Sequence, residues 1–303
     1  MEKEKRLICL SPYMALDKKK FITRTLSAAV FAGVLLSSIF LGYITFSILF
    51  FIISIWALHE FYKLMELKQL TPNKTIGFTI GILWYLFCFL WCADELLILE
   101  VSGSNLMLLL FLSFVLLFIL SAAELFRNKE KPFENIAVTF FGILYAVLPF
   151  CLFHFIACPN SLALLSFGAK HYESFIVFGL FLLIWSNDTF AYLVGSFIGK
   201  NKMYERISPG KTWEGTIGGA LLTVLFSMFF YNWFGVLSTN DWMLIGIIVA
   251  VFGTVGDLIE SMLKRSVGVK DSGNVMPGHG GILDRFDSLI YVLPLVFLYL
   301  MLN

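Results

Sequence analysis

The sequence predicts an all-α, polytopic integral membrane protein with about nine transmembrane helices and a cytoplasmic N-terminus. Of its 303 residues, 59% are apolar and only 14% are charged, and the mean hydropathy is +0.85. Soluble domains carry about 25% charged residues, so this chain has too little polar surface for a soluble fold. Lipid favours helices because they satisfy their own backbone hydrogen bonds. The net charge of +1 points to no nucleic-acid partner.

Nine stretches of the chain are long and apolar enough to form spanning helices, which need about 20 residues each. They cover residues 22–41, 43–62, 76–96, 104–122, 135–157, 174–198, 213–235, 242–262 and 286–302. Residues 1–21 form a polar N-terminal segment without the apolar run of a signal peptide. Within it, Met1 and Met14 are both candidate start residues.

The basic residues fix the predicted orientation of these helices. Cytoplasmic loops carry the excess of Lys and Arg, and 21 of the 22 basic residues fall in the N-terminal segment or in alternate loops. Lys170 is the exception. The N-terminus is therefore predicted on the cytoplasmic side of the cell membrane, inner or plasma, with Asn303 outside.

Polar residues are distributed unevenly between the two parts of the chain. The five predicted helices within 22–173 carry few ionisable residues in their interiors, whereas polar residues interrupt or adjoin the helices within 174–303. Ionisable groups in a membrane are expensive and mark functional sites. We therefore expect 22–173 to be a transmembrane scaffold and 174–303 to be the catalytic region.

Asp188 interrupts the predicted helix 174–198. A carboxylate at this depth indicates a functional site, with an interhelical hydrogen bond as the alternative. Ala191, Gly195 and Gly199 follow at four-residue spacing. Small residues at this spacing let two helices approach closely, so we interpret them as a packing face.

The loop after this helix contains Ser208-Pro209-Gly210-Lys211-Thr212, directly before a predicted helix. Backbone amides at a helix N-terminus together with a lysine form a natural phosphate site. The spacing of a P-loop is absent. The alternative is a basic loop that meets anionic lipid head groups.

The strongest candidate site lies between residues 257 and 287. On a helix, Asp257, Glu260, Ser261 and Lys264 share one face. Carboxylates and basic groups then continue in a glycine-rich segment, where glycine allows close approach of the backbone to a ligand. Acidic oxygens suit hard cations such as Mg²⁺, and Lys and Arg suit the phosphates that accompany them. A salt-bridged connector is the alternative. The further members are Lys270, Asp271, His279, Gly280, Gly281, Asp284, Arg285 and Asp287.

Histidine adds little to this site. His279 has no neighbouring His or Cys residues that would complete a zinc site. His59 and Glu60, at the end of the predicted helix 43–62, are expected at the membrane interface.

The run from Ser261 to Asp287 resembles the signature of phosphatidate cytidylyltransferases, also called CDP-diacylglycerol synthases. Asp188, in the setting Ser-Asn-Asp-Thr-Phe-Ala-Tyr, and the stretch from Ser208 to Gly215 are similar to that family too. The specific resemblance covers the chain from Asp188 onward. Gly210 departs from the pattern, because a second lysine is expected there, and this weakens one phosphate contact.

This resemblance implies an enzyme that converts CTP and phosphatidate into CDP-diacylglycerol and pyrophosphate. It implies Mg²⁺, a second, monovalent cation such as K⁺, and a homodimer in the lipid bilayer. By motif, Asp257 and Asp284 are the metal ligands, supported by Asp188 and Asp287. The remaining implied residues are Lys211, Lys264, Arg265, Lys270, Asp271 and Arg285 for catalysis and phosphate binding, and Ser208, Thr212, Glu260, Ser261, His279, Gly280 and Gly281 for substrate binding.

Two other functions remain open at the level of the sequence. CTP-dependent polyprenol and phytol kinases look similar across the same region, but they release CDP instead of pyrophosphate. An ion-coupled transporter also carries intramembrane acids. Against a transporter, the polar cluster is predicted at one membrane face, and the chain shows no internal repeat.

Overall fold

The computed structural model describes residues 18–97, 103–159, 171–275 and 280–303. The predictions that concern Met1, Met14, Lys170 and His279 lie outside these residues. The helices are α1 (Lys18–Phe40), α2 (Tyr43–Glu66), α3 (Lys74–Leu97), α4 (Gly103–Arg127), α5 (Pro132–Ala146), α6 (Leu148–Ala157), α7 (Ser174–Ile198), α8 (Trp213–Ser227), α9 (Phe230–Phe234), α10 (Thr239–Ile248), α11 (Thr254–Ser266) and α12 (Leu283–Leu302). Two strands, β1 (Lys202–Tyr204) and β2 (Ser208–Thr212), and a π-helical turn, η2 (Val249–Gly253), complete them.

The helical membrane class is confirmed. Seven helical segments in the described part of the chain are long and apolar enough to cross a membrane, and a shorter apolar helix covers Thr25–Phe40. Each of the nine predicted stretches contains helix in the structure. The number of helices that cross the bilayer stays a prediction, as does the division at residue 174. The seven segments are Tyr43–Glu66, Lys74–Ala93, Leu106–Arg127, Pro132–Ala157, Ser174–Ile198, Thr239–Ser266 and Leu283–Leu302.

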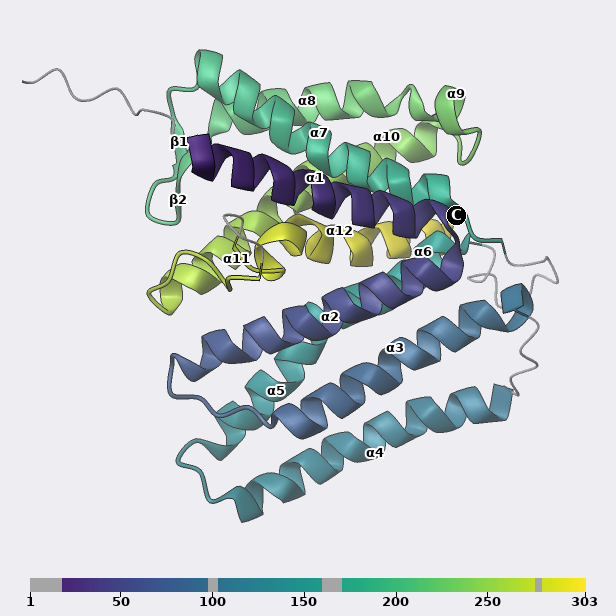
Figure 1. Cartoon of the computed structure of the whole chain (residues 1–303), viewed down its shortest axis with the longest axis vertical. Coiled ribbons are helices and arrows are strands. Elements are labelled where there is room, and N and C mark those ends of the chain that lie inside the picture. The colour runs from purple at the N-terminus through teal and green to yellow at the C-terminus, as the bar shows by residue number, and fades with distance from the viewer. Residues whose placement is uncertain (1–17, 98–102, 160–170, 276–279) are drawn as a thin grey trace, which may run out of the picture.

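The helices lie side by side in the molecule (Figure 1). α7, α8 and α10 form one side, and α3 and α4 form the other, with α6 and α12 between them. α12 packs against α6 and α11. This central helix therefore connects the scaffold to the region that carries the candidate site.

Small residues allow the close packing of α7 against α8, as the four-residue spacing predicts. A Cβ atom added at Gly219 would lie 2.7 Å from the Cα atom of Ala191, and one at Gly215 would lie 2.9 Å from the Cα atom of Gly195. These distances leave no room for a side chain at either glycine. The interpretation of Ala191 and Gly195 as a packing face is confirmed.

Buried phenylalanines join α2, α6 and α12 in the core. The rings of Phe50 and Phe153 are edge-to-face with centroids 5.0 Å apart, and Phe286 is edge-to-face with Phe50 at 6.2 Å and with Phe150 at 5.9 Å. Edge-to-face contacts place the positive ring edge against the negative face of the neighbour. Because Phe286 adjoins Asp287 in the sequence, this core also fixes the start of α12.

Two of the predicted helices are interrupted. The stretch 135–157 divides into α5 and α6 around Val147, and Pro149 lies in the first turn of the second helix. The stretch 242–262 runs through α10, η2 and α11, and its π turn changes the direction in which the following residues face. Such turns are frequent at functional sites, and the carboxylate-bearing face of α11 follows directly.

The all-α prediction missed a short antiparallel hairpin. β1 pairs with β2 so that Lys202 lies opposite Thr212 and Tyr204 lies opposite Ser208. Two strands of three and five residues are too short to give a clear alternating pattern in the sequence. The hairpin ends where α8 begins, which agrees with the predicted position of the Ser-Pro-Gly-Lys-Thr loop before a helix.

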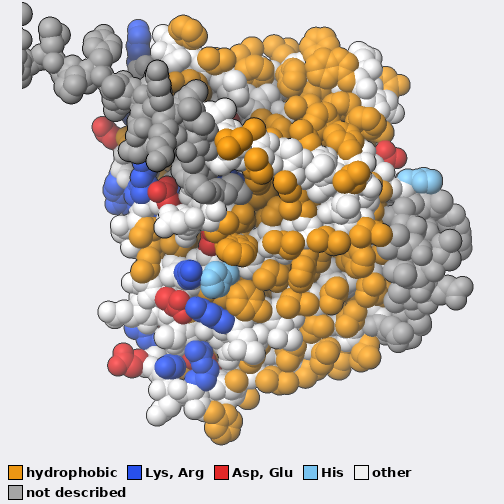
Figure 2. All heavy atoms as spheres, viewed as in Figure 1, with side chains coloured by type: hydrophobic (Ala, Val, Ile, Leu, Met, Phe, Trp, Pro, Cys, Tyr) orange, Lys and Arg blue, Asp and Glu red, His pale blue; other side chains and the backbone are white. Residues whose placement is uncertain are grey.

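Charged side chains gather at one end of the molecule (Figure 2). Hydrophobic side chains cover most of the rest of this face, as lipid contact requires. The hairpin and the loop between α2 and α3 lie at the charged end (Figure 1). The arrangement agrees with the one-sided distribution of Lys and Arg, and the compartment at that end stays a prediction.

Candidate active site

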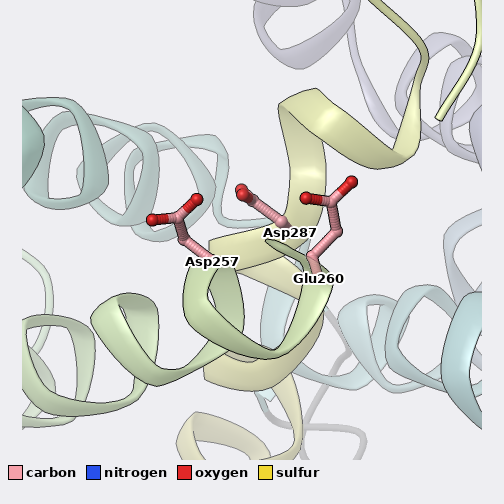
Figure 3. Close-up of side chains that lie close together, drawn as sticks. All are labelled: Asp257, Glu260 and Asp287. Atoms are coloured by element: carbon pink, nitrogen blue, oxygen red, sulfur yellow. The ribbon is translucent and has the colours of Figure 1, made fainter. Parts of the chain in front are cut away.

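Three carboxylates from two helices form the centre of the candidate site. Asp257 and Glu260 lie on the same face of α11, and Asp287 projects toward them from α12 (Figure 3). One oxygen atom of each lies within 4.8 Å of the others. Like charges this close repel one another unless a cation or a proton neutralises them. We call Asp257, Glu260 and Asp287 the acidic cluster.

Gly256 allows the two helices to bring these acids together. A Cβ atom at this position would lie 2.6 Å from the carbonyl oxygen of Asp287 and 3.1 Å from the side chain of Tyr291. Any side chain would therefore push α12 away from α11. The Gly-Asp pair at residues 256 and 257 thus couples close helix packing to the placement of a carboxylate.

Two lysines partly neutralise the acids. Lys264, one turn after Glu260 on α11, places its Nζ atom 2.5 Å from Glu260 and 2.6 Å from Asp284. Lys211 of β2 forms an ion pair with Asp257. The phosphate loop predicted from the sequence therefore contacts the acidic cluster directly.

The carboxylate of Asp284 accepts hydrogen bonds from neighbouring protein groups, and Asp284 is not a member of the acidic cluster. Its Oδ2 atom accepts hydrogen bonds from the backbone amides of Gly281 (2.7 Å) and Ser272 (3.0 Å), and its Oδ1 atom accepts from Lys264 (2.6 Å). These donors occupy much of its hydrogen-bonding capacity. The role of Asp284 as a direct metal ligand stays a prediction, whereas Glu260 takes the third position in the cluster.

The carboxylate of Glu260 has few hydrogen-bond donors around it in the described part of the chain. The residue is fully buried. Although Lys264 forms an ion pair with it, neither of its carboxylate oxygens receives a hydrogen bond from an amide or hydroxyl group in the described part of the chain. A buried carboxylate with so few donors is costly unless a cation completes its environment.

A cavity of about 500 Å³ opens beside the acidic cluster. Its wall combines charged and apolar side chains. Such a cavity suits a molecule with a charged head and an apolar body. The charged lining residues are Asp188, Asp257, Asp284, Arg285 and Asp287, and the larger apolar ones include Phe31, Phe181, Ile184, Trp185 and Phe286.

Hydrogen bonds at the start of α8 fix the hairpin strand that carries Lys211. Thr212 caps this helix, because its Oγ1 atom accepts the amide of Gly215 at 3.2 Å. Glu214 accepts the amides of Lys200 and Asn201, both at 3.1 Å to Oε2. Glu214 lies outside the seven spanning segments, and its pKa is lowered because its own backbone amide and those of Asn201 and Lys200 donate hydrogen bonds to the carboxylate.

The other predicted residues are not members of the acidic cluster. Arg265 donates to the carbonyl oxygen of Val269 at 2.8 Å and so holds the turn after α11. Lys270 and Asp271 are exposed on the segment that follows. Ser208 and Ser261 are partly buried.

Glu60 of α2 makes contacts that the sequence did not predict. It is only 2% exposed, so its carboxylate is buried in the protein, and its depth in the membrane stays a prediction. Its carboxylate accepts the backbone amides of Ile282 at 3.0 Å and Leu283 at 2.9 Å, and the hydroxyl of Ser272 at 3.0 Å. These partners lie 212 to 223 residues later in the chain, so no local pattern predicts the contact.

Two glycines of the motif make room for Glu60. A Cβ atom at Gly273 would lie 2.5 Å from the Oε1 atom of Glu60, and one at Gly281 would lie 2.6 Å from the same atom. Gly280 differs, because its φ of +79° is in the left-handed region that favours glycine. At Gly273 and Gly281 the backbone approaches a buried carboxylate, and the expected approach of these glycines to a ligand stays a prediction.

Comparisons with known proteins show the family to which the chain belongs. A family model described as the cytidylyltransferase family matches residues 22–303. The phosphatidate cytidylyltransferase of Bacillus subtilis (strain 168) is 34% identical over 290 residues, which cover 94% of this chain and 97% of that protein. Those of Staphylococcus aureus (strain COL) and Staphylococcus epidermidis (strain ATCC 12228 / FDA PCI 1200) are each 43% identical, over 53% of this chain and 66% of the relative.

Proposed function

The chain belongs to the cytidylyltransferase family, and from this premise we propose how its site carries out the transfer. It is a membrane nucleotidyltransferase that transfers CMP from CTP to phosphatidate, giving CDP-diacylglycerol and pyrophosphate. The observation that carries the proposal is the acidic cluster, which is paired with Lys211 and Lys264 and lies beside a cavity lined by both charged and apolar side chains.

The acidic cluster fits a divalent cation of the Mg²⁺ type. Asp257, Glu260 and Asp287 offer only carboxylate oxygens, the ligands that hard cations prefer, and no His or Cys side chain joins them in the described part of the chain. When bound there, Mg²⁺ supplies charge neutralisation for the nucleotide phosphates and for the pyrophosphate that leaves. The same proposal includes a monovalent cation such as K⁺ as a second ion.

The protein's own residues position the two phosphates. A phosphate monoester is largely dianionic near neutral pH, because its second pKa is about 6, and therefore needs no strong general base. One of its oxygens attacks the α-phosphorus of CTP, and the bond from that phosphorus to the bridging oxygen of pyrophosphate breaks. Lys211, which forms an ion pair with Asp257, and Arg285, which lines the cavity, are suited to hold the phosphates in line.

The apolar wall of the cavity is suited to the diacylglycerol part of the substrate. Phe31 of α1 and Trp185 of α7 lie on this wall. We place the site at the cytoplasmic face of the cell membrane, where CTP is available and where the basic loops are predicted. A homodimer is part of the same proposal.

Purified protein supplied with labelled CTP, phosphatidate and Mg²⁺ tests the function. The expected products are labelled CDP-diacylglycerol and an equal amount of pyrophosphate, and removal of Mg²⁺ with EDTA should abolish both. Release of CDP instead of pyrophosphate would identify a kinase. Ion flux in proteoliposomes without turnover of CTP would identify a transporter.

A further inference from the structure

The hydrogen bonds of Glu60 continue from the scaffold into the acidic cluster. The Ser272 hydroxyl lies 3.0 Å from an oxygen of Glu60 and 3.0 Å from Oδ2 of Asp284. Asp284 then contacts the Nζ atom of Lys264 at 2.6 Å, and Lys264 contacts Glu260 at 2.5 Å. A continuous chain of polar contacts therefore runs from α2 to α11.

We infer that Glu60 is a positioning residue of the transferase, which holds Ser272, Asp284 and the first turn of α12 so that the acidic cluster keeps the geometry that binds a cation. The inference rests on the proposed function of the cluster. It assigns to the first half of the chain a direct part in the site, because α2 belongs to the predicted scaffold.

The surroundings of Glu60 form a receptor for one carboxylate. Its two oxygen atoms accept two amides at the start of α12 and one hydroxyl. The amides at a helix N-terminus have no partner within the helix, and the helix dipole favours a negative charge there. Gly273 and Gly281 close on the carboxylate at distances that admit no side chain.

Ser272 is the link that couples Glu60 to Asp284. Its hydroxyl group has a single proton, while both neighbouring carboxylates are acceptors. The backbone amide of Ser272 donates to Asp284 independently, at 3.0 Å. Loss of the hydroxyl therefore breaks the connection to Glu60 without removing the cap that Glu60 provides to α12.

Binding of Mn²⁺ to the purified full-length protein tests the inference without relying on turnover. Free Mn²⁺ is measured by electron paramagnetic resonance. Glu60→Gln replaces one acceptor oxygen by an NH₂ group, which faces amide or hydroxyl donors. We expect its Mn²⁺ affinity to fall about tenfold, the effect of losing a partner that orients metal ligands. Ser272→Ala should weaken binding in the same direction by a smaller factor.

Two acids in the scaffold serve as matched controls. Glu66, on the same helix, forms a surface ion pair with Lys74 at 2.7 Å. Glu124 is buried and is bonded to Arg127 at 2.6 Å and Asn135 at 2.8 Å. Glu66→Gln should leave both stability and Mn²⁺ binding unchanged, and Glu124→Gln should lower stability without changing Mn²⁺ binding.

The inference is overturned if Glu60→Gln binds Mn²⁺ as tightly as the wild type, or if Glu124→Gln weakens binding to the same extent. If Glu60→Gln does not fold, Ser272→Ala is the variant that tests the inference. An unchanged Mn²⁺ affinity of Ser272→Ala then overturns it. Failure of the proposed function would be seen separately, as wild-type protein that binds Mn²⁺ but forms no CDP-diacylglycerol.

Discussion

Replacement of Gly281 by alanine tests whether this glycine serves the folded protein or its substrate. The added Cβ atom would collide with the hydroxyl of Ser272 and with both carboxylate oxygens of Glu60, one of them at 2.6 Å. Glu60 and Ser272 are both buried, at 2% and 7% exposure. Neither can therefore swing into solvent, so the contact must be relieved by moving the start of α12.

The expected cost follows from two contributions. Overpacking a buried site costs about 1–3 kcal/mol, and weakening one buried hydrogen bond adds about 1 kcal/mol. The 2.7 Å bond from the Gly281 amide to Asp284 is the first to be affected. Gly281→Ala should therefore destabilise the protein by about 2–4 kcal/mol, which lowers the melting temperature by at least about 4 °C.

Thermal unfolding of the purified protein in detergent, without CTP or lipid substrate, measures this effect. Gly210→Ala is the matched control, because a Cβ atom at Gly210 would have no neighbour within 4 Å. It should melt with the wild type. The reasoning is refuted if Gly281→Ala also melts with the wild type and instead raises the KM for CTP, since the glycine would then serve the ligand.

Two further predictions concern the helix contact and the hairpin. Gly219→Val should force α7 and α8 apart, because its Cβ atom would lie 2.7 Å from the Cα atom of Ala191. The free energy of unfolding should fall by about 1–3 kcal/mol. An unchanged melting temperature would argue against close packing of the two helices. Gly210→Lys restores the lysine that the family resemblance leads one to expect. Since position 210 is exposed and has no close neighbours, the variant should fold normally. Its KM for CTP should fall by no more than about fivefold, the effect of one exposed charge. A raised KM in steady-state kinetics would contradict the binding of a phosphate at the hairpin.

The helices and the chemistry of the site could be predicted because both depend on local patterns. Apolar length marks each spanning helix, and the spacing of Asp257 and Glu260 places them on one face of α11. The approach of Asp287 from α12 also follows the motif. These features need only the residues within one helix or in two neighbouring helices.

The contacts of Glu60 could not be predicted in this way, nor could the different hydrogen bonding of Asp284 and Glu260. Glu60 lies 222 residues before Ile282, so only the packing of α2 near α12 brings them together. Asp284 and Glu260 differ by their donors: Asp284 receives two backbone amides, and Glu260 receives none in the described residues. Which acid is bonded to the protein and which is left for a cation therefore depends on tertiary structure.

The central claim is that the acidic cluster carries Mg²⁺-dependent transfer of CMP. The most direct test measures labelled CDP-diacylglycerol formed from CTP and phosphatidate by wild-type protein, Asp257→Asn and Asp287→Asn, with the exposed Glu134→Gln as control. We predict that both aspartate variants fold normally and lose at least about a hundredfold in rate, while Glu134→Gln matches the wild type. Rates within a few-fold of the wild type in both aspartate variants would contradict the assignment of the cluster.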